Sequence, residues 1–365
     1  MLQSYVNVNL TALQDNFLTF QARNPGKLIV PVIKSDAYGH GLTETARALV
    51  AVGATTVAIF NLHEAEILRQ SGYEHEIWSL EGALPAEIGT PASLTTTLAL
   101  WNWETAQALS DYAVAHNCTF RVHLKLDTGM GRLGFLPEDI PALWPRLAAL
   151  PGLNFTGCFS HLATADIPGS PLTDRQVQAF RQALAVLPPS VSQRHLCATA
   201  GLQHHLAPEL PCGRLGIGLY GCCPDQTERD EELVPALEFR SQVISVKELP
   251  AGKTVSYGAL YELPAPARLA VVPVGYADGY PRCLGNRACV LIGGKRCLIR
   301  GRVCMGMLMA DVSECGNVRP GDEVVLIGRQ GEEEIRIEEL AELAETITYE
   351  IFCNLGKHPL RYHSA

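Results

Sequence analysis

The sequence lacks any apolar run of about 18 residues, the length that a membrane-spanning helix requires. The first residues also have neither the basic region nor the apolar core of a secretory signal peptide. We therefore expect a cytoplasmic protein without a membrane partner.

Cysteine pairs at metal-binding spacing are missing as well. The 12 cysteines are scattered from Cys118 to Cys353, and no two have the C-x-x-C spacing. This pattern excludes a zinc ribbon and a dense disulfide framework, and it indicates buried thiols in a reducing compartment. The adjacent His204 and His205 have no third ligand at a characteristic spacing, so no metal is expected.

The sequence has fewer basic than acidic residues. It contains 29 Lys and Arg against 38 Asp and Glu, which gives a net charge of -9. A nucleic-acid partner is therefore not expected. An apolar fraction of 47% is typical of a globular protein with a large core. Because 365 residues exceed one ordinary core, we expect a barrel of about 250 residues with a smaller module.

Short β-rich runs alternate with helical periodicity between residues 28 and 219. The helical stretches place apolar residues on one face, as at Leu42, Ala46, Leu49 and Val50. This alternation predicts a (β/α)8 TIM-type barrel, with a doubly wound sheet as the alternative. The expected strands are 28–33, 56–60, 76–80, 94–98, 119–126, 154–160, 194–198 and 211–215.

After Gly221 the sequence becomes turn-rich and acidic, which indicates a domain boundary. We expect the barrel to occupy residues 1–231 and a mostly β C-terminal domain to occupy 232–365. The first ten residues are candidates to pair with the second domain. Its expected elements are strands at 237–246, 268–274, 288–292, 297–303 and 323–327, and a helix at 337–344.

The most informative segment is the apolar run 28–33, which ends abruptly on Lys34. An ammonium at the mouth of a hydrophobic strand loses hydration, which favours the neutral, nucleophilic amine of a lysine that forms a Schiff base. The structural alternative is a lysine that caps the strand and extends its charge into water.

Further polar residues follow other barrel strands, where the active sites of such barrels lie. Each also has a structural explanation, as a surface cation, a core imidazole or a helix cap. These residues are Lys125, Arg132, His161, Thr199 and Arg214.

The segment 213–221 contains a G-x-G-x-x-G pattern, but no amphipathic helix follows it, so we reject a dinucleotide site. Glycines still let backbone N–H groups approach an anion such as phosphate. A phosphate cradle late in a barrel and an activated lysine early in it suggest pyridoxal phosphate as the cofactor.

Several motifs, in order along the whole chain, resemble the alanine racemase family, which combines such a barrel with a C-terminal β domain and uses pyridoxal phosphate. The resemblance implies a racemase of L- and D-alanine and a head-to-tail homodimer with shared active sites. The motifs lie at 34–41, 125–134, 159–163, 214–221, 256–258, 275–282 and 301–305, with Tyr349 near the end.

The resemblance also implies the roles of individual residues. Lys34 would hold the cofactor and act as the base on the D-specific side, and Tyr257 would act on the L-specific side. His161 and Arg214 would favour the phenolate of Tyr257, and Arg214 would also lie beside the pyridine nitrogen of the cofactor. The phosphate contacts implied by the resemblance are Tyr38, Thr199 and the backbone at Gly216 and Ile217.

The remaining implied residues bind or support the substrate. Arg132 and the backbone at Met305 would hold the substrate carboxylate, and Lys125 matches a lysine that relatives often carry as a carbamate. The supporting residues of the β domain would be Tyr276, Arg282 and Arg302.

Two departures from the family pattern leave other activities open. Gly306 stands where the family usually has an acid, and residues 354–357 also differ, so a serine or broad-specificity racemase is the alternative. A non-catalytic carrier of pyridoxal phosphate is a further alternative. A decarboxylase and a cofactor-free aldolase fit less well, because they leave Tyr257 or the glycine-rich cradle unexplained.

Overall fold

The computed structural model describes residues 4–225 and 229–364. It divides into two compact units, which we call the barrel unit and the C-terminal unit. The barrel unit comprises Leu13–Ala37 and Leu42–Val234. The C-terminal unit comprises Met1–Ala12, Tyr38–Gly41 and Pro235–Ala365.

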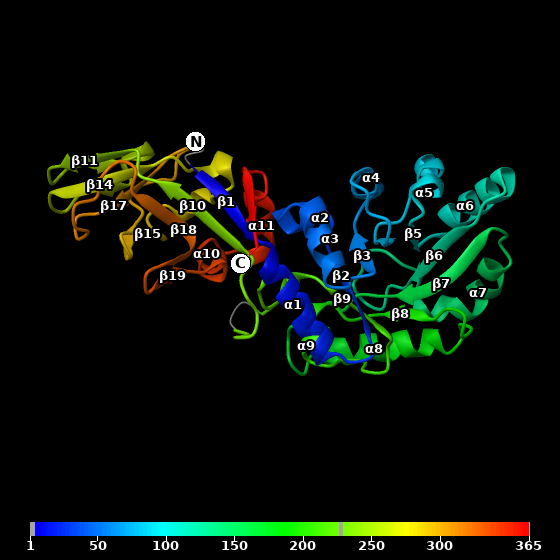
Figure 1. Cartoon of the computed structure of the whole chain (residues 1–365). Coiled ribbons are helices and arrows are strands. Elements are labelled where there is room, and N and C mark those ends of the chain that lie inside the picture. The colour runs from blue at the N-terminus through cyan, green and yellow to red at the C-terminus, as the bar shows by residue number, and fades with distance from the viewer. Residues whose placement is uncertain (1–3, 226–228, 365) are drawn as a thin grey trace. The chain divides into compact units, whose positions relative to one another are not determined.

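The barrel unit contains eight parallel strands in the order β2-β9-β8-β7-β6-β5-β4-β3 (Figure 1). A parallel bridge between Val32 and Ala58 joins the first strand to the last and closes the sheet. The predicted (β/α)8 barrel is therefore confirmed. The strands are β2 (Leu28–Pro31), β3 (Thr56–Ile59), β4 (Glu76–Ser79), β5 (Thr97–Leu100), β6 (Phe120–Lys125), β7 (Leu153–Phe159), β8 (Gln193–His195) and β9 (Cys212–Leu215).

Helices connect these strands, and the predicted apolar stripe explains why they pack on the sheet. In α3 the residues Leu42, Ala46 and Leu49 are buried, as expected from their spacing. The helices are α1 (Leu10–Arg23), α2 (Lys34–Gly39), α3 (Leu42–Ala51), α4 (Leu62–Gln70), α5 (Gly89–Leu94), α6 (Trp103–His116), α7 (Ile140–Ala148), α8 (Pro171–Leu184) and α9 (Thr199–Gln203).

The strand expected at 94–98 was placed three residues too early. Residues Gly89–Leu94 form α5, which ends at Thr95 in a left-handed conformation with φ 52°. The chain can extend only after this turn, so β5 begins at Thr97.

The C-terminal unit is built mainly from β-sheets. Its largest sheet has the order β16-β15-β18-β10-β1-β20, with β19 paired to β18. A second sheet has the order β11-β14-β17, and β12 pairs with β13. The strands are β1 (Ser4–Asn9), β10 (Leu237–Gln242), β11 (Ser245–Leu249), β12 (Thr254–Val255), β13 (Tyr261–Glu262), β14 (Ala267–Val272), β15 (Cys289–Ile292), β16 (Lys295–Leu298), β17 (Leu308–Asp311), β18 (Glu323–Gln330), β19 (Glu333–Ile335) and β20 (Leu360–His363).

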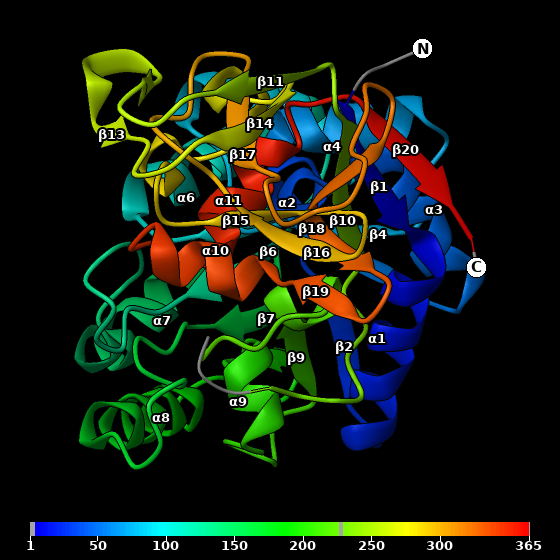
Figure 2. The same ribbon diagram turned by 90° about the vertical axis from the view of Figure 1, so that its left-hand side faces the viewer.

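The first strand belongs to this unit, as expected. β1 runs antiparallel to β10 and parallel to β20, which lies beside it in Figure 2. The pairing is confirmed for Ser4–Asn9, and residues 1–3 lie outside the described part of the chain.

Other boundaries in the C-terminal unit differ from the predictions. The run 237–246 forms two strands, β10 and β11, and the strand expected at 297–303 ends at Leu298. The helix expected at 337–344 is α10 (Ile337–Leu343), and α11 (Thr348–Leu355) was not predicted. Among the described residues, no helix has the length and apolar character needed to cross a membrane.

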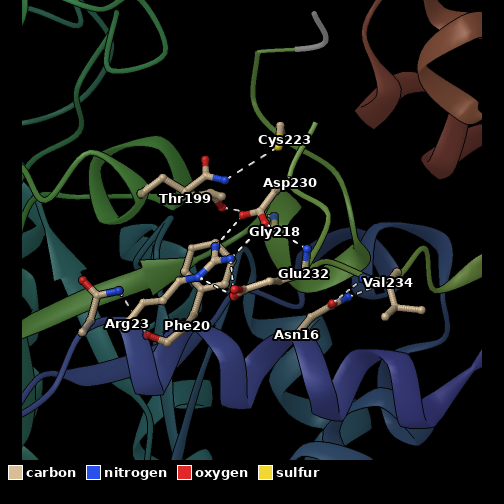
Figure 3. A network of polar contacts seen from close by, with 11 residues as sticks. Asn16, Phe20, Arg23, Thr199, Gly218, Cys223, Asp230, Glu232 and Val234 are labelled. Atoms are coloured by element: carbon tan, nitrogen blue, oxygen red, sulfur yellow. Dashed lines mark hydrogen bonds and ion pairs between the residues drawn. The ribbon is translucent and has the colours of Figure 1, made fainter. Parts of the chain in front are cut away.

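Polar contacts bind the segment after the barrel to α1 (Figure 3). The fully buried Asn16 donates to the carbonyls of Leu219 and Val234 at 3.0 and 2.8 Å, and accepts from the Val234 N–H at 2.8 Å. Arg23 pairs with Asp230 and Glu232. The acidic run suggested a domain boundary. Its described residues Asp230 and Glu232 also hold the chain against α1 where it leaves the barrel.

We expect Asn16→Ala to lower the free energy of unfolding by about 2 kcal/mol, because it leaves buried backbone groups without partners. The midpoint of urea unfolding, followed by circular dichroism, measures the loss. Gln107→Ala is the control, since the half-buried Gln107 makes a surface hydrogen bond to Asp111 on the same helix, and this variant should change the midpoint little. Equal midpoints for the two variants would contradict the role of Asn16.

Candidate active site

The barrel brings the predicted site residues to the carboxyl ends of its strands. Lys34 follows β2, Lys125 ends β6 and His161 follows β7. Thr199 begins α9 after β8, and Arg214 lies on β9. Because parallel strands end at the same rim, residues from distant parts of the sequence share one site.

This rim carries a concentration of positive charge. The pKa of His161 is lowered to about 3, first by burial and then by four cations. The neutral imidazole is therefore the stable form at neutral pH. The four cations are Arg214, Lys125, Arg132 and Lys34.

Arg214 is the most deeply buried of these cations, with 3% of its surface exposed. Its Nη2 donates to the Ser160 and Leu196 carbonyls at 2.8 and 3.0 Å, and to His161 Nδ1 at 3.3 Å. Its Nη1 donates to the carbonyl and the Nδ1 of His195. All of these acceptors are neutral. They hold the guanidinium in place but do not balance its positive charge.

The bond to Arg214 determines the tautomers of two buried histidines. A guanidinium only donates, so His195 Nδ1 must accept and the ring proton lies on Nε2. That N–H donates to His123 Nδ1 at 3.0 Å, and His123 Nε2–H then donates to the Gln193 Oε1 at 2.8 Å. Burial lowers the pKa of His123 to about 4 and holds that of His195 well below its usual value, which agrees with two neutral rings.

Aromatic side chains fix the plane of His195 between them. Phe159 stacks on its ring with centroids 4.7 Å apart, and Trp78 stacks on it at 4.5 Å. His123 meets the same tryptophan edge-on. Trp78, His123 and His195 come from β4, β6 and β8, so alternate strands contribute this layer of the barrel.

Lys125 is buried at the end of β6, with its Nζ 4.5 Å from the centre of the Phe159 ring. Its pKa is lowered to about 7, first by burial and then by the charges of Arg214 and Arg132. A large fraction of the side chain is therefore a neutral amine at physiological pH.

The loop that carries Arg132 is organised by a carboxylate that the sequence analysis did not single out. Asp127 accepts hydrogen bonds from the backbone N–H groups of four residues at 2.8 to 3.1 Å. Burial opposes ionisation, but these four donors together lower the pKa of Asp127 below its usual value. The donors are Gly129, Met130, Gly131 and Arg132.

The glycine-rich segment after β9 folds over the hydroxyl of Thr199. The N–H groups of Gly216 and Gly218 both donate to Thr199 Oγ1 at 3.2 Å. Ile217 is fully buried between them. Because the oxygen accepts twice, the hydroxyl hydrogen is left to act as a donor.

The C-terminal unit brings a second group of predicted residues together. Ser256 Oγ donates to the Arg302 carbonyl at 2.7 Å, which joins the loop of Tyr257 to the loop of Arg302. The Ala277 N–H donates to the Met305 carbonyl at 2.8 Å, next to Tyr276.

Several large side chains of this group are exposed. Tyr257 is 71% exposed, Met305 63% and Tyr276 43%. Arg282, at the start of a short turn, is exposed as well. Gly306 borders open space, because no atom lies within 4 Å of where a Cβ would stand.

Tyr38 also belongs to the C-terminal unit. Its ring lies 5.6 Å from that of Tyr349 in α11. The structure thus divides the predicted residues between its units, with Tyr38 only four positions after Lys34 in the chain.

Sequence reasoning missed Asp127, His123 and His195. The Asp-Thr-Gly-Met-Gly run was a usable signal for Asp127, since an Asp before glycines often accepts backbone hydrogen bonds. The histidines lie within β-rich runs, and only their polar character among apolar neighbours distinguishes them.

Comparisons with known proteins agree with this geometry. Residues 8–224 match the family described as "Alanine racemase, N-terminal domain", and residues 236–363 match "Alanine racemase, C-terminal domain". An alanine racemase of Syntrophobacter fumaroxidans is 39% identical over 366 residues, which cover 98% of this chain and 96% of that protein.

Solved structures give the same result. The crystal structure of alanine racemase from E. faecalis has a TM-score of 0.92 at 32% identity, covering 99% of this chain and 98% of that one. The biosynthetic alanine racemase from Pseudomonas aeruginosa has a TM-score of 0.90 at 34% identity, covering 100% of both chains.

We expect Lys125 to titrate with a midpoint near pH 7. Since the unfolded chain keeps this proton up to about pH 10.4, the contribution of Lys125 to stability should rise with pH between these values. NMR of protein labelled with 13C at the lysine ε-carbon measures the titration, and Lys125→Met should remove the signal. If every lysine signal titrates near pH 10, the lowered pKa is wrong.

Proposed function

The chain belongs to the alanine racemase family of pyridoxal-phosphate-dependent isomerases, and we propose that Lys34 and Tyr257 are the acid/base groups with which it interconverts L- and D-alanine. Racemisation requires removal of a proton from one face of Cα and delivery of a proton to the other face. Two groups on opposite sides of the substrate meet this requirement. We assign Lys34 to the D-specific side and Tyr257 to the L-specific side.

The charge of the barrel rim supports the binding of pyridoxal phosphate. Arg214 and Arg132, together with two lysines, contribute positive charge near His161, and a phosphate with a substrate carboxylate would offset this charge. The hydroxyl of Thr199 and the backbone at Gly216 and Ile217 would hold the phosphate, together with Tyr38. When bound, the cofactor supplies an electron sink for the negative charge that develops at Cα.

Arg214 supports a particular tuning of that electron sink. We propose that it lies beside the pyridine nitrogen, where a permanent cation keeps this nitrogen unprotonated. Its hydrogen bonds to backbone carbonyls and to His195 hold the charge in place. A weaker electron sink limits side reactions of the carbanion, which suits an enzyme that only moves a proton.

His161 is suited to assist Tyr257. Its Nδ1 accepts from Arg214, so the proton of the neutral ring lies on Nε2 and is available to a phenolate. A phenolate that accepts this hydrogen bond is a better base than a phenol in water.

The substrate carboxylate would be held by Arg132 and the backbone at Met305. Asp127 fixes the backbone of the loop that carries Arg132. The neutral amine of Lys125 can add to carbon dioxide and release a proton to solvent, which gives a carbamate whose negative charge would then orient Arg132. Tyr276, Arg282 and Arg302 would support this part of the site.

The exposure of Tyr257 carries the proposal of a shared site. A phenol that is 71% exposed is largely solvated by water, whereas an acid/base group acts from a fixed position beside the reacting atom. Met305 and Tyr276 are exposed on the same unit. We propose that this surface meets the barrel unit of a second copy, in a head-to-tail homodimer with two shared sites.

Alanine is the proposed substrate, and serine is the second candidate. The open space beside Gly306 favours a wider substrate entrance than an acidic side chain would leave. A cytoplasmic location is proposed from the sequence.

We expect L-alanine in heavy water to gain deuterium at Cα with inversion, and Tyr257→Phe to slow inversion by at least about 100-fold. Chiral chromatography with mass spectrometry, after addition of pyridoxal phosphate, measures both quantities. Tyr112→Phe is the control, because Tyr112 lies on α6 of the barrel unit. Parallel reactions with L-serine rank the substrates, and a wild-type protein that exchanges neither amino acid would overturn the proposal.

Mixing two inactive chains tests the shared site. Lys34→Ala and Tyr257→Phe chains, unfolded and refolded together, should recover about a quarter of the wild-type activity, since half the dimers contain one intact site. Each variant refolded alone is the control. Mixed dimers that form but stay inactive would place both groups in one chain.

A further inference from the structure

The parallel ladder between β2 and β3 stops immediately before Lys34. The Ile33 N–H donates to the Ala58 carbonyl at 2.8 Å, which forms the last rung of the ladder. A further rung would join the Phe60 N–H to the Ile33 carbonyl and the Ser35 N–H to the Phe60 carbonyl. Both carbonyls are used elsewhere, since Ile33 accepts from Ala37 at 2.8 Å and Phe60 accepts from Glu81 at 3.0 Å.

One carboxylate takes the place of the missing rung. Glu64 Oε2 accepts from the Phe60 N–H at 2.8 Å, and its Oε1 accepts from the Ser35 N–H. These are the two donors that the next rung would have used. Glu64 is 8% exposed, so the interaction is buried.

The segment after Lys34, which belongs to α2, needs such support because its backbone is left-handed, a conformation that L-residues disfavour. Residues 35–38 are all left-handed, with φ between 52 and 54°. Each such residue costs roughly 1 to 2 kcal/mol relative to a right-handed one, and none of the four is glycine. Strain of this kind persists only where surrounding contacts determine the conformation.

Helix α4 fixes the position of the carboxylate. The side chain of Asn61 caps the helix and accepts from the Glu64 N–H at 3.0 Å. In a capping box, the glutamate at this position would bond the cap residue's own N–H. Here its carboxylate reaches Phe60 and Ser35 instead, and so joins two barrel strands at the rim.

We propose that Glu64 is a positioning residue for Lys34. By ending the ladder at Ile33 and holding the Ser35 N–H, its carboxylate keeps the turn left-handed and sets the direction in which Lys34 leaves the strand. The proposal rests on the assignment of Lys34 as the lysine that holds the cofactor and moves the proton.

The test is Glu64→Gln, which keeps the shape of the side chain but offers one acceptor and one NH2 group to two N–H donors. We expect kcat for alanine to fall at least about tenfold, because a small misplacement of a reacting group is costly. Hydrogen exchange of the apo protein should show faster exchange at Ser35 and Phe60. The rate at which pyridoxal phosphate becomes attached to Lys34, trapped with borohydride and followed by peptide mass, should fall as well.

The matched control is Glu66→Gln on the same helix, whose half-exposed carboxylate faces His63. It should match the wild type in all three measurements. A rescue separates positioning from a general loss of structure, because Ser35 is exposed and glycine adopts φ 54° without strain. Ser35→Gly added to Glu64→Gln should recover at least about threefold in kcat.

The outcomes distinguish the two proposals. If the wild type does not attach pyridoxal phosphate at Lys34, the assignment of Lys34 fails. If the wild type does attach it and Glu64→Gln behaves like Glu66→Gln, the role of Glu64 is refuted. A loss in Glu64→Gln that Ser35→Gly leaves unchanged would also refute positioning through the turn.

Discussion

The barrel site depends on the buried guanidinium of Arg214, which donates hydrogen bonds to neutral carbonyl and imidazole groups. Placing a cation in a protein interior is costly unless its N–H groups are satisfied, and Arg214 is satisfied by three carbonyls and two imidazoles. These acceptors bind the N–H groups of the guanidinium but, being neutral, do not cancel its positive charge. The field of Arg214 then lowers the pKa of His161, Lys125 and His195, in each case together with burial. Burial, and after it the charge of Arg214, therefore favours the neutral forms of these neighbours, and the guanidinium makes the rim attractive to anions.

The histidine chain explains how a polar cluster is tolerated inside the barrel. Arg214 donates to His195, each of the two histidine rings accepts at Nδ1 and donates from Nε2, and Gln193 accepts the last hydrogen bond. Protonation of either ring would turn an acceptor into a donor and break the chain. Burial keeps both rings neutral, and the neutral tautomers satisfy the buried hydrogen bonds. Trp78 and Phe159 stack on His195 and fix the plane of its ring.

The sequence could predict the barrel and the strand ends that carry its candidate residues because both follow from local patterns. Apolar runs mark the strands, and Lys34, Lys125 and His161 stand where strands end, which is where barrel sites form. Glu64 could not be found this way. Its partners are backbone N–H groups of Ser35 and Phe60, and a backbone donor leaves no mark on the sequence.

Long-range pairing was hard to predict for a related reason. β20 lies against β1 through parallel backbone bonds between residues at opposite ends of the chain. The short strand was not recognised because Arg361 and His363 interrupt its apolar character. Similarly, the run 237–246 reads as one strand, but the backbone of Val243 bonds with Gly321 and Asp322, which ends β10 before β11 begins.

The irregular backbone after β2 is consistent with the role proposed for Lys34. In the role proposed for Lys34, the direction of its side chain is set where the chain leaves the ladder, because side chains of a regular strand alternate between two faces. The chain leaves the ladder at Ile33 and is strained over residues 35–38, and the buried carboxylate of Glu64 offsets this strain by accepting hydrogen bonds from Ser35 and Phe60. Four consecutive left-handed residues directly follow Lys34, while the adjacent strand β3 keeps regular parallel pairing with β4.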